Sequence, residues 1–152
     1  MADIFREPLF QASLTHFLAA PGQQKLFAAG TFDAGLFQSA DEGATWSLAL
    51  DGGVQGLAGT GPVVLVATTS DGVLRSDNYG NTFKPGPGLT GEVHQLTING
   101  STWWAATGAG LASSTDNATT FSPVTTTDTQ GVFFAGGTII AITPAGPTLY
   151  QP

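Results

Sequence analysis

The sequence predicts an all-β protein, a β-propeller of four four-stranded blades. Three observations predict this fold. A Ser-x-Asp or Ser-x-Asn pattern recurs three times, 37 residues apart from Ser39 to Ser76 and 38 residues apart from Ser76 to Ser114. Short runs rich in β-branched or aromatic residues precede each pattern, and no sustained 3.6-residue apolar period occurs. The 152 residues amount to about four units of this length, and a repeat of four short strands at such a period is typical of one propeller blade.

Each unit is expected to contain strands in the same order. An innermost strand comes first, followed by a second strand, a third strand that begins after a glycine, the Ser-x-Asp turn and a fourth strand. The innermost runs are 15–18, 54–57, 93–96 and 131–134, and the second runs are 26–29, 63–67, 103–106 and 139–142. The third strands follow Gly35, Gly72, Gly110 and Gly146. The expected units are therefore about 12–50, 51–89, 90–127, and 128–152 together with 1–11.

The chain ends before the fourth strand of its last unit. Residues 1–11 precede the first unit, and we expect them to supply the missing strand and to complete the last blade. Pro8 fits this position because proline is tolerated in an edge strand. Two arrangements remain open: a ring closed within one chain, or a homodimer in which two chains exchange terminal strands and form a larger ring.

The three Ser-x-Asp segments, 39–46, 76–83 and 114–121, resemble the Asp-box or BNR repeat of sialidase-type propellers, which also occurs in sortilin ectodomains. In this pattern the Asp or Asn side chain caps a turn, the glycine adopts a positive φ, and the aromatic residue packs into the blade. The third segment departs from it, with Ala118 where glycine is usual, so a different turn or some strain is expected there. The residues that match are Ser39, Asp41, Gly43, Thr45 and Trp46, then Ser76, Asn78, Gly80, Thr82 and Phe83, then Ser114, Asp116, Thr120 and Phe121.

Composition excludes several classes of partner and of chemistry. The chain has 11 Asp and Glu against 4 Lys and Arg, a net charge of −7, which disfavours nucleic acid and anionic membranes as partners. Without cysteine there is no disulfide, no thiolate zinc site and no cysteine nucleophile. No apolar run reaches the length of a membrane span, and no signal peptide is visible, so the compartment stays open.

The sialidase resemblance does not extend to sialidase activity. Sialidases are known for three arginines that bind the substrate carboxylate, whereas this chain contains only Arg6 and Arg75. A glycosidase that uses two carboxylates stays an alternative, with Glu92 as the acid that adjoins an innermost strand. Most other acids fall at turns, and no catalytic motif is present.

One position near the start of the innermost strands is a candidate ligand site. Alignment on the glycine that ends each strand places His16, Gln55, His94 and Gly131 at equivalent positions. The hypothesis is that His16 and His94 face each other across the central channel, with Gln55 beside them, and bind a metal ion, an anion or a small polar ligand. The alternative is that they only cap the channel. Two histidines without a carboxylate make a thin metal site, so no metal or cofactor is expected.

The function that follows is a non-catalytic binding or scaffold module, which would use a propeller face or the central channel. Its partner is expected to be a protein or a carbohydrate. The alternatives are a lectin-like propeller and a glycoside hydrolase of unknown specificity. Trp103 and Trp104 are expected to pack between blades, with carbohydrate stacking as the alternative.

Overall fold

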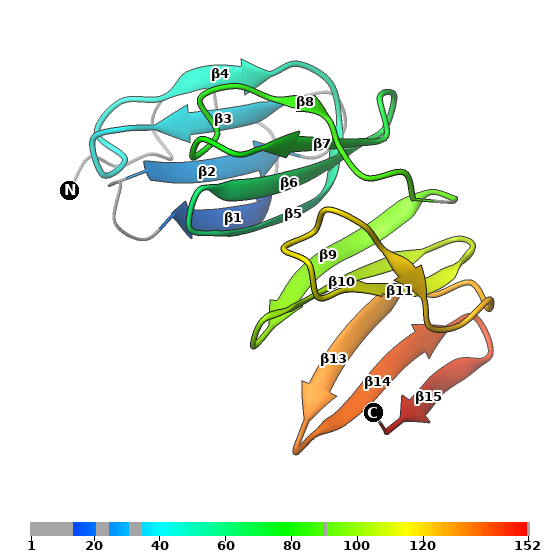
Figure 1. Cartoon of the computed structure of the whole chain (residues 1–152). Coiled ribbons are helices and arrows are strands. Elements are labelled where there is room, and N and C mark those ends of the chain that lie inside the picture. The colour runs from blue at the N-terminus through cyan, green and yellow to red at the C-terminus, as the bar shows by residue number, and fades with distance from the viewer. Residues whose placement is uncertain (1–13, 21–24, 31–34, 90, 152) are drawn as a thin grey trace.

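The computed structural model describes residues 14–20, 25–30, 35–89 and 91–151, and these residues form an all-β structure, as predicted (Figure 1). The described part contains no helix, and therefore none that could cross a membrane. Its strands form four antiparallel sheets of consecutive strands. The first sheet contains β1 (Leu14–Ala20), β2 (Lys25–Gly30), β3 (Leu36–Ser39) and β4 (Ser47–Leu50). The second sheet contains β5 (Val54–Thr60), β6 (Val63–Thr68), β7 (Val73–Ser76) and β8 (Lys84–Pro85). The third sheet contains β9 (Val93–Asn99), β10 (Thr102–Thr107), β11 (Gly110–Ser114) and β12 (Ser122–Pro123), and the fourth contains β13 (Gly131–Ala135), β14 (Thr138–Thr143) and β15 (Gly146–Tyr150).

The first strand of each sheet is the innermost one. β5 packs against β1 on one side and β9 on the other, and β9 packs against β13. Each sheet then runs outward from its first strand to its last. The sheets follow one another in an open arc, with β1–β4 at one end and β13–β15 at the other (Figure 1).

Three hydrophobic clusters hold the four sheets together. Phe27 and Leu36 of the first sheet pack with Val64 and Val66 of the second. A second cluster joins Leu65 and its neighbours to the third sheet through Trp103, and a third joins Trp104 to the fourth sheet. Adjacent residues of a strand point to opposite faces, so the two tryptophans serve two different interfaces. Both are buried, which confirms the expectation that they are core residues.

The ends of the arc differ from the expected closed ring. The first and fourth sheets lie apart, and β15 is the outer strand of a sheet that has three strands among the described residues (Figure 1). The expectation that the N-terminal segment completes this sheet falls on residues 1–13, outside the described part of the chain.

Candidate functional site

The Ser-x-Asp turn of the first sheet is held by hydrogen bonds within a few residues. The hydroxyl of Ser39 donates to Oδ1 of Asp41 at 2.8 Å and accepts from the backbone N–H of Gly43 at 2.8 Å. Asp41 accepts in turn from the backbone N–H of Thr45 at 2.8 Å and from its hydroxyl at 2.5 Å. Ser39 is almost fully buried, so its hydroxyl needs these partners.

The second and third turns repeat this geometry. Ser76 bonds Asn78 Oδ1 at 2.8 Å, and Ser114 bonds Asp116 Oδ1 at 2.6 Å. The same oxygens accept the backbone N–H of Thr82 at 3.0 Å and of Thr120 at 2.9 Å. Asn78 takes the place of a carboxylate in the second turn. Its amide nitrogen donates to the Thr82 hydroxyl at 2.9 Å, whereas the carboxylates of the other two turns accept from the threonine hydroxyl at 2.5 Å and 2.6 Å.

Ala118 occupies the third turn in the conformation that glycine has in the others. Its φ is +59°, against +91° for Gly43 and +75° for Gly80. The turn therefore keeps its geometry and carries the strain of a left-handed alanine. The methyl group lies fully buried in the cluster that contains Leu65. In the first sheet the register position of Leu65 is held by Phe27, whose ring would lie 2.3 Å from a Cβ at position 80.

The aromatic residues of the turns are partly buried. Phe83 packs against the cluster of the first two sheets, and Phe121 packs against the next cluster. The indole N–H of Trp46 donates to the carbonyl of Gly43 at 3.1 Å. The two phenylalanines thus tie their turns to the sheets, and the Trp46 contact closes its own turn.

The hydrogen bonds of the third turn lower the pKa of Asp116 well below its ordinary value of 3.8. The largest cause is the bond from the Ser114 hydroxyl, followed by the bond from the Thr120 hydroxyl. The pKa of Asp41 is lowered too, chiefly by Thr45. A carboxyl group with a lower pKa in the folded state contributes stability above its unfolded pKa and loses it as the pH falls towards the folded pKa.

We therefore expect the free energy of unfolding of the wild type to decrease as the pH falls below about 4. Asp116→Asn should be less stable at pH 7 and should show a flatter pH dependence between pH 4 and pH 2. Asn78 shows that this turn accepts an asparagine. Thermal unfolding followed by circular dichroism across this range checks it, and equal pH slopes for the two proteins would contradict it.

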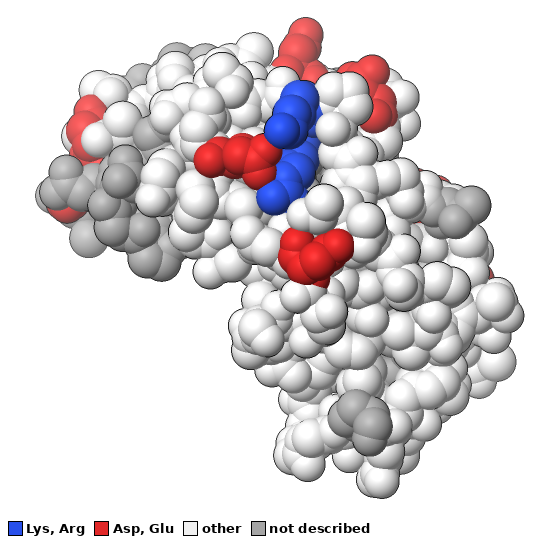
Figure 2. Space-filling model, viewed as in Figure 1, with Lys and Arg blue, Asp and Glu red and all other residues white. Residues whose placement is uncertain are grey.

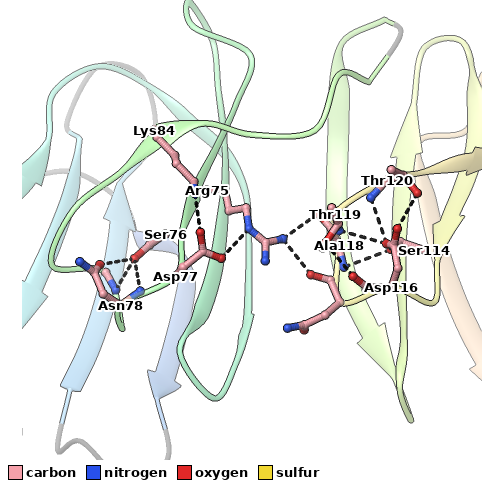
Figure 3. A network of polar contacts seen from close by, with 12 residues as sticks. Arg75, Ser76, Asp77, Asn78, Lys84, Ser114, Asp116, Ala118, Thr119 and Thr120 are labelled. Atoms are coloured by element: carbon pink, nitrogen blue, oxygen red, sulfur yellow. Dashed lines mark hydrogen bonds and ion pairs between the residues drawn. The ribbon is translucent and has the colours of Figure 1, made fainter.

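An arginine bridge links the second sheet to the third turn (Figure 3). Nη1 of Arg75 donates to the backbone carbonyls of Asn117 and Ala118, each at 2.8 Å, and Nε donates to Asp77 at 2.7 Å. Lys84 pairs with the other oxygen of Asp77 at 2.6 Å. The carbonyls of the third turn thus receive a charged donor from the neighbouring sheet. Figure 2 shows basic side chains in one patch with acidic side chains on both sides.

A second group of polar side chains lies at the opposite end of the sheets, where the innermost strands begin. We call Gln55, Glu92, His94 and Asp128 the rim. The amide of Gln55 on β5 donates to a carboxylate oxygen of Glu92 just before β9. Nε2 of His94 on β9 lies 3.5 Å from Oδ1 of Asp128, a buried oxygen that has no hydrogen-bond partner.

Backbone bonds fix the two acids of the rim beside one turn. The carbonyl of Glu92 accepts from the N–H of Gly108, and the N–H of Thr129 next to Asp128 donates to the carbonyl of Thr107. Glu92 and Asp128 therefore flank the β10–β11 turn. Glu92 is exposed, and 41% of the Asp128 side chain is exposed, so both acids can reach a ligand from solvent.

Two hollows adjoin the rim. One of about 430 Å³ lies between the second and third sheets and is lined by Gln55, Thr68, Leu89 and Glu92. Another of about 320 Å³ is lined by His94, Gln95, Gln130 and Phe133. The rim is thus a polar edge over two shallow cavities, which suits binding of a polar ligand.

The alignment that grouped His16 with Gln55 and His94 is wrong by one residue. Gln55 and His94 are the extra residues of β-bulges, whereas His16 pairs with Ala29 and so lies level with Gly56 and Gln95. Gly131 shares this second position. The error in the alignment arises because the connection between β1 and β2 has four residues, whereas the equivalent connection in each later sheet has two. The side chain of His16 lies outside the described part.

The opposition of His16 and His94 across a channel stays a prediction, because it depends on the side chain of His16. The first and third sheets lie on either side of the second. No group of three or more His, Asp or Glu side chains able to hold a metal occurs among the described residues.

Sequence reasoning missed three contacts. The acids other than Glu92 were placed mostly at turns, so the contact of Asp128 with His94 was not foreseen, nor were the pairing of Gln55 with Glu92 and the bridge from Arg75. Each joins residues that are far apart in the sequence. The only available signal was that Glu92 adjoins an innermost strand.

No family model matches the sequence, and no curated protein matches it significantly. Solved structures do match its fold. YCF48 from Cyanidioschyzon merolae superposes with a TM-score of 0.70 at 15% identity, over 93% of this chain and 53% of that one. YCF48 bound to D1 peptide gives 0.67 at 14% identity, over 93% and 52%. The chain has the β-propeller fold. It spans about half the length of YCF48.

Two computationally designed proteins match it with different coverage. Ika4 superposes with a TM-score of 0.63 at 10% identity, over 93% of this chain and 92% of Ika4. Ika8 gives 0.62 at 11% identity, over 93% of this chain and 46% of Ika8. The same arrangement of sheets thus occurs in a chain of similar length and in one about twice as long.

Proposed function

We propose that this chain is a non-catalytic binding module of the Asp-box propeller type that holds a peptide with basic side chains on its rim. The observation that carries the proposal is the convergence of Gln55, Glu92, His94 and Asp128, from two neighbouring sheets and the segments beside them, over two hollows. The repeated Ser-x-Asp turns lie at the other end of the sheets, where local hydrogen bonds hold them.

The charge of the rim favours a cationic ligand. Its two carboxylates are accessible, and the described basic side chains, Arg75 and Lys84, lie at the opposite end of the sheets. The net charge of −7 adds a field that attracts cations to the whole molecule. Lysine and arginine side chains would pair with Glu92 and Asp128, while the amides of Gln55 and Gln130 can bond a peptide backbone.

A peptide is favoured over a sugar for two reasons. Trp103 and Trp104 are buried between sheets, so they are not available as platforms for carbohydrate. YCF48, which shares the fold, has been solved with a bound peptide. The three turns support the Asp-box assignment through their common hydrogen-bond pattern.

The test uses an array of twelve-residue peptides whose charge varies from acidic to basic. We expect the wild type to bind basic members and to release them as salt rises. Glu92→Gln and Asp128→Asn should each weaken this binding by about tenfold, the value of one solvent-screened ion pair together with a hydrogen bond.

Glu42→Gln is the matched control, because it removes the same charge at the opposite end of the first sheet. It should leave binding nearly unchanged. Equal losses in Glu42→Gln and Glu92→Gln would mean that net charge alone acts, and absence of binding to any basic peptide would reject the rim as a peptide site.

A further inference from the structure

The fourth sheet lacks the outer strand that the other three sheets have. β15 is the third strand of its sheet, and among the described residues no strand pairs with its outer edge. In the other sheets the third strands β3, β7 and β11 each pair with a fourth strand, which is β4, β8 or β12. β15 is therefore an open edge, and its residues Pro147, Thr148 and Leu149 are exposed.

Leu149 holds the position at which the other sheets pair with their fourth strands. It pairs inward with Ile140, as the equivalent residues of β3, β7 and β11 pair inward with β2, β6 and β10. These equivalent residues are Gln38, Arg75 and Ser113, and they pair outward with Ser47, Lys84 and Ser122. At Leu149 the outward partner is missing among the described residues.

The backbone groups that point outward from β15 follow from the other sheets. The carbonyls of Val73 and Leu111, which hold the register position of Pro147, accept backbone hydrogen bonds at 2.8 Å and 2.7 Å from the segments that follow β8 and β12. Alternate residues of an antiparallel strand direct their N–H and C=O groups to the same side, so Leu149 directs both groups outward. Pro147 offers only its carbonyl, because proline has no N–H.

The side chains of this edge are apolar and uncharged. Leu149 is 66% exposed, although the equivalent residues of the other sheets are polar. It lies in one row with Ile140 and with Phe133, which is 56% exposed. β8 and β12 each have two residues and include a proline, features that keep natural edge strands from pairing with other chains. β15 has five residues, and only Pro147 limits its edge.

The distribution of charge indicates which partner fits this edge. Residues 129–152 contain no Asp, Glu, Lys or Arg, whereas the whole chain has a net charge of −7. A partner of opposite charge gains no ion pair at this edge, and an identical acidic chain can approach it without bringing like charges together. Figure 2 shows the end of the molecule that carries β13–β15 in white.

We infer that β15 pairs with β15 of a second copy of this chain, antiparallel and around a twofold axis at Leu149. The N–H and C=O groups of each Leu149 then bond the same groups of the other copy. Each Pro147 carbonyl accepts from the N–H of Gln151 of the other copy. The two apolar rows join across a sheet of six strands, with the two leucines as a cross-strand pair. The edge is complementary to itself because one residue directs both a donor and an acceptor outward.

The contact involves one short strand from each copy. Small interfaces of this kind give weak association, so the dimer should depend on concentration. The contact uses no residue of the rim, so failure of this inference and failure of the proposed peptide binding are separate results.

Sedimentation velocity of the wild type should show the monomer at about 10 µM and a growing share of dimer up to about 1 mM. Leu149→Lys should weaken the association by about tenfold or more, because it places two lysines directly opposite each other. Leu48→Lys is the matched control, since Leu48 lies on the outer strand β4 and is 53% exposed. It should associate as the wild type does. Circular dichroism shows whether both variants are folded.

Amide hydrogen exchange of the wild type tests the geometry of the contact without any substitution. The N–H of Thr148 points inward to β14, so it should be protected at every concentration. The N–H of Leu149 should exchange freely in the monomer and should slow severalfold as the dimer forms.

Three results would overturn the inference. The first is a wild type that stays monomeric at about 1 mM. The second is a dimer that forms equally in Leu149→Lys, or one that leaves the exchange of the Leu149 N–H unchanged, since two sheets packed by their faces would bury the side chain and leave the N–H free. The third is loss of the dimer in Leu48→Lys, which would place the contact at β4.

Discussion

Gly80→Ala is expected to lower the free energy of unfolding by about 3 kcal/mol. A Cβ at this position would lie 2.3 Å and 2.6 Å from two ring atoms of Phe27, and φ at this glycine is +75°. The left-handed conformation costs an alanine about 1–2 kcal/mol, and overpacking a filled core adds about 1–3 kcal/mol. Denaturant unfolding measures the loss.

The third turn suggests how this loss can be reversed. Ala118 has the same conformation, and the residue at the register position of Phe27 is there the smaller Leu65. Phe27→Leu alone should cost about 1–2 kcal/mol because a fully buried side chain becomes smaller. In the double variant the alanine methyl gains room. The loss of stability of the double variant should therefore be about 1–2 kcal/mol smaller than the sum of the losses of the two single variants.

This double-mutant cycle tests whether the turn of one sheet and the core residue of its neighbour form one unit. Additive losses would mean that Phe27 and position 80 are independent, and that the strain at position 80 comes from its backbone alone.

Arg75→Met is expected to cost about 2 kcal/mol, because hydrogen bonds to a charged group contribute about 1.5–3 kcal/mol. The side chain of Arg75 is only 13% exposed, and it gives the carbonyls of Asn117 and Ala118 their charged donor. Methionine keeps much of the apolar stem, so the variant isolates the loss of the guanidinium.

The matched control for this bridge is Lys84→Met. Lys84 is 65% exposed and contacts only Asp77 of the bridge, so its loss should change stability little. Amide hydrogen exchange distinguishes the two variants, because Arg75→Met should speed exchange at Ala118, Thr119 and Thr120. Equal exchange rates in both variants would show that the bridge does not hold the third turn.

The repeated turns were predictable because their bonds are local. Ser39 and Gly43 are four residues apart, as are Asp41 and Thr45, so one short pattern carries the whole network. The all-β class followed from the same period. The assignment of Ala118 was uncertain because the neighbouring core residue that admits its methyl group lies in another sheet.

The rim was less predictable for a physical reason. Gln55 contacts Glu92, which lies 37 residues further along the chain. Gln55 and His94 are the extra residues of β-bulges, which shift the strand register by one residue, and no sequence pattern indicates these bulges. A single longer connection in the first sheet displaced His16 in the alignment. The period gives the number of sheets but not the angle between them, so a closed ring of four and an open arc of four fit the same repeat.

Small-angle X-ray scattering in solution tests most directly whether the four sheets form an open arc. The expected result is a profile that fits the arc of Figure 1, with the first and fourth sheets apart. The profile of a compact ring of four sheets would contradict it, because the first and fourth sheets would then have to meet within one molecule.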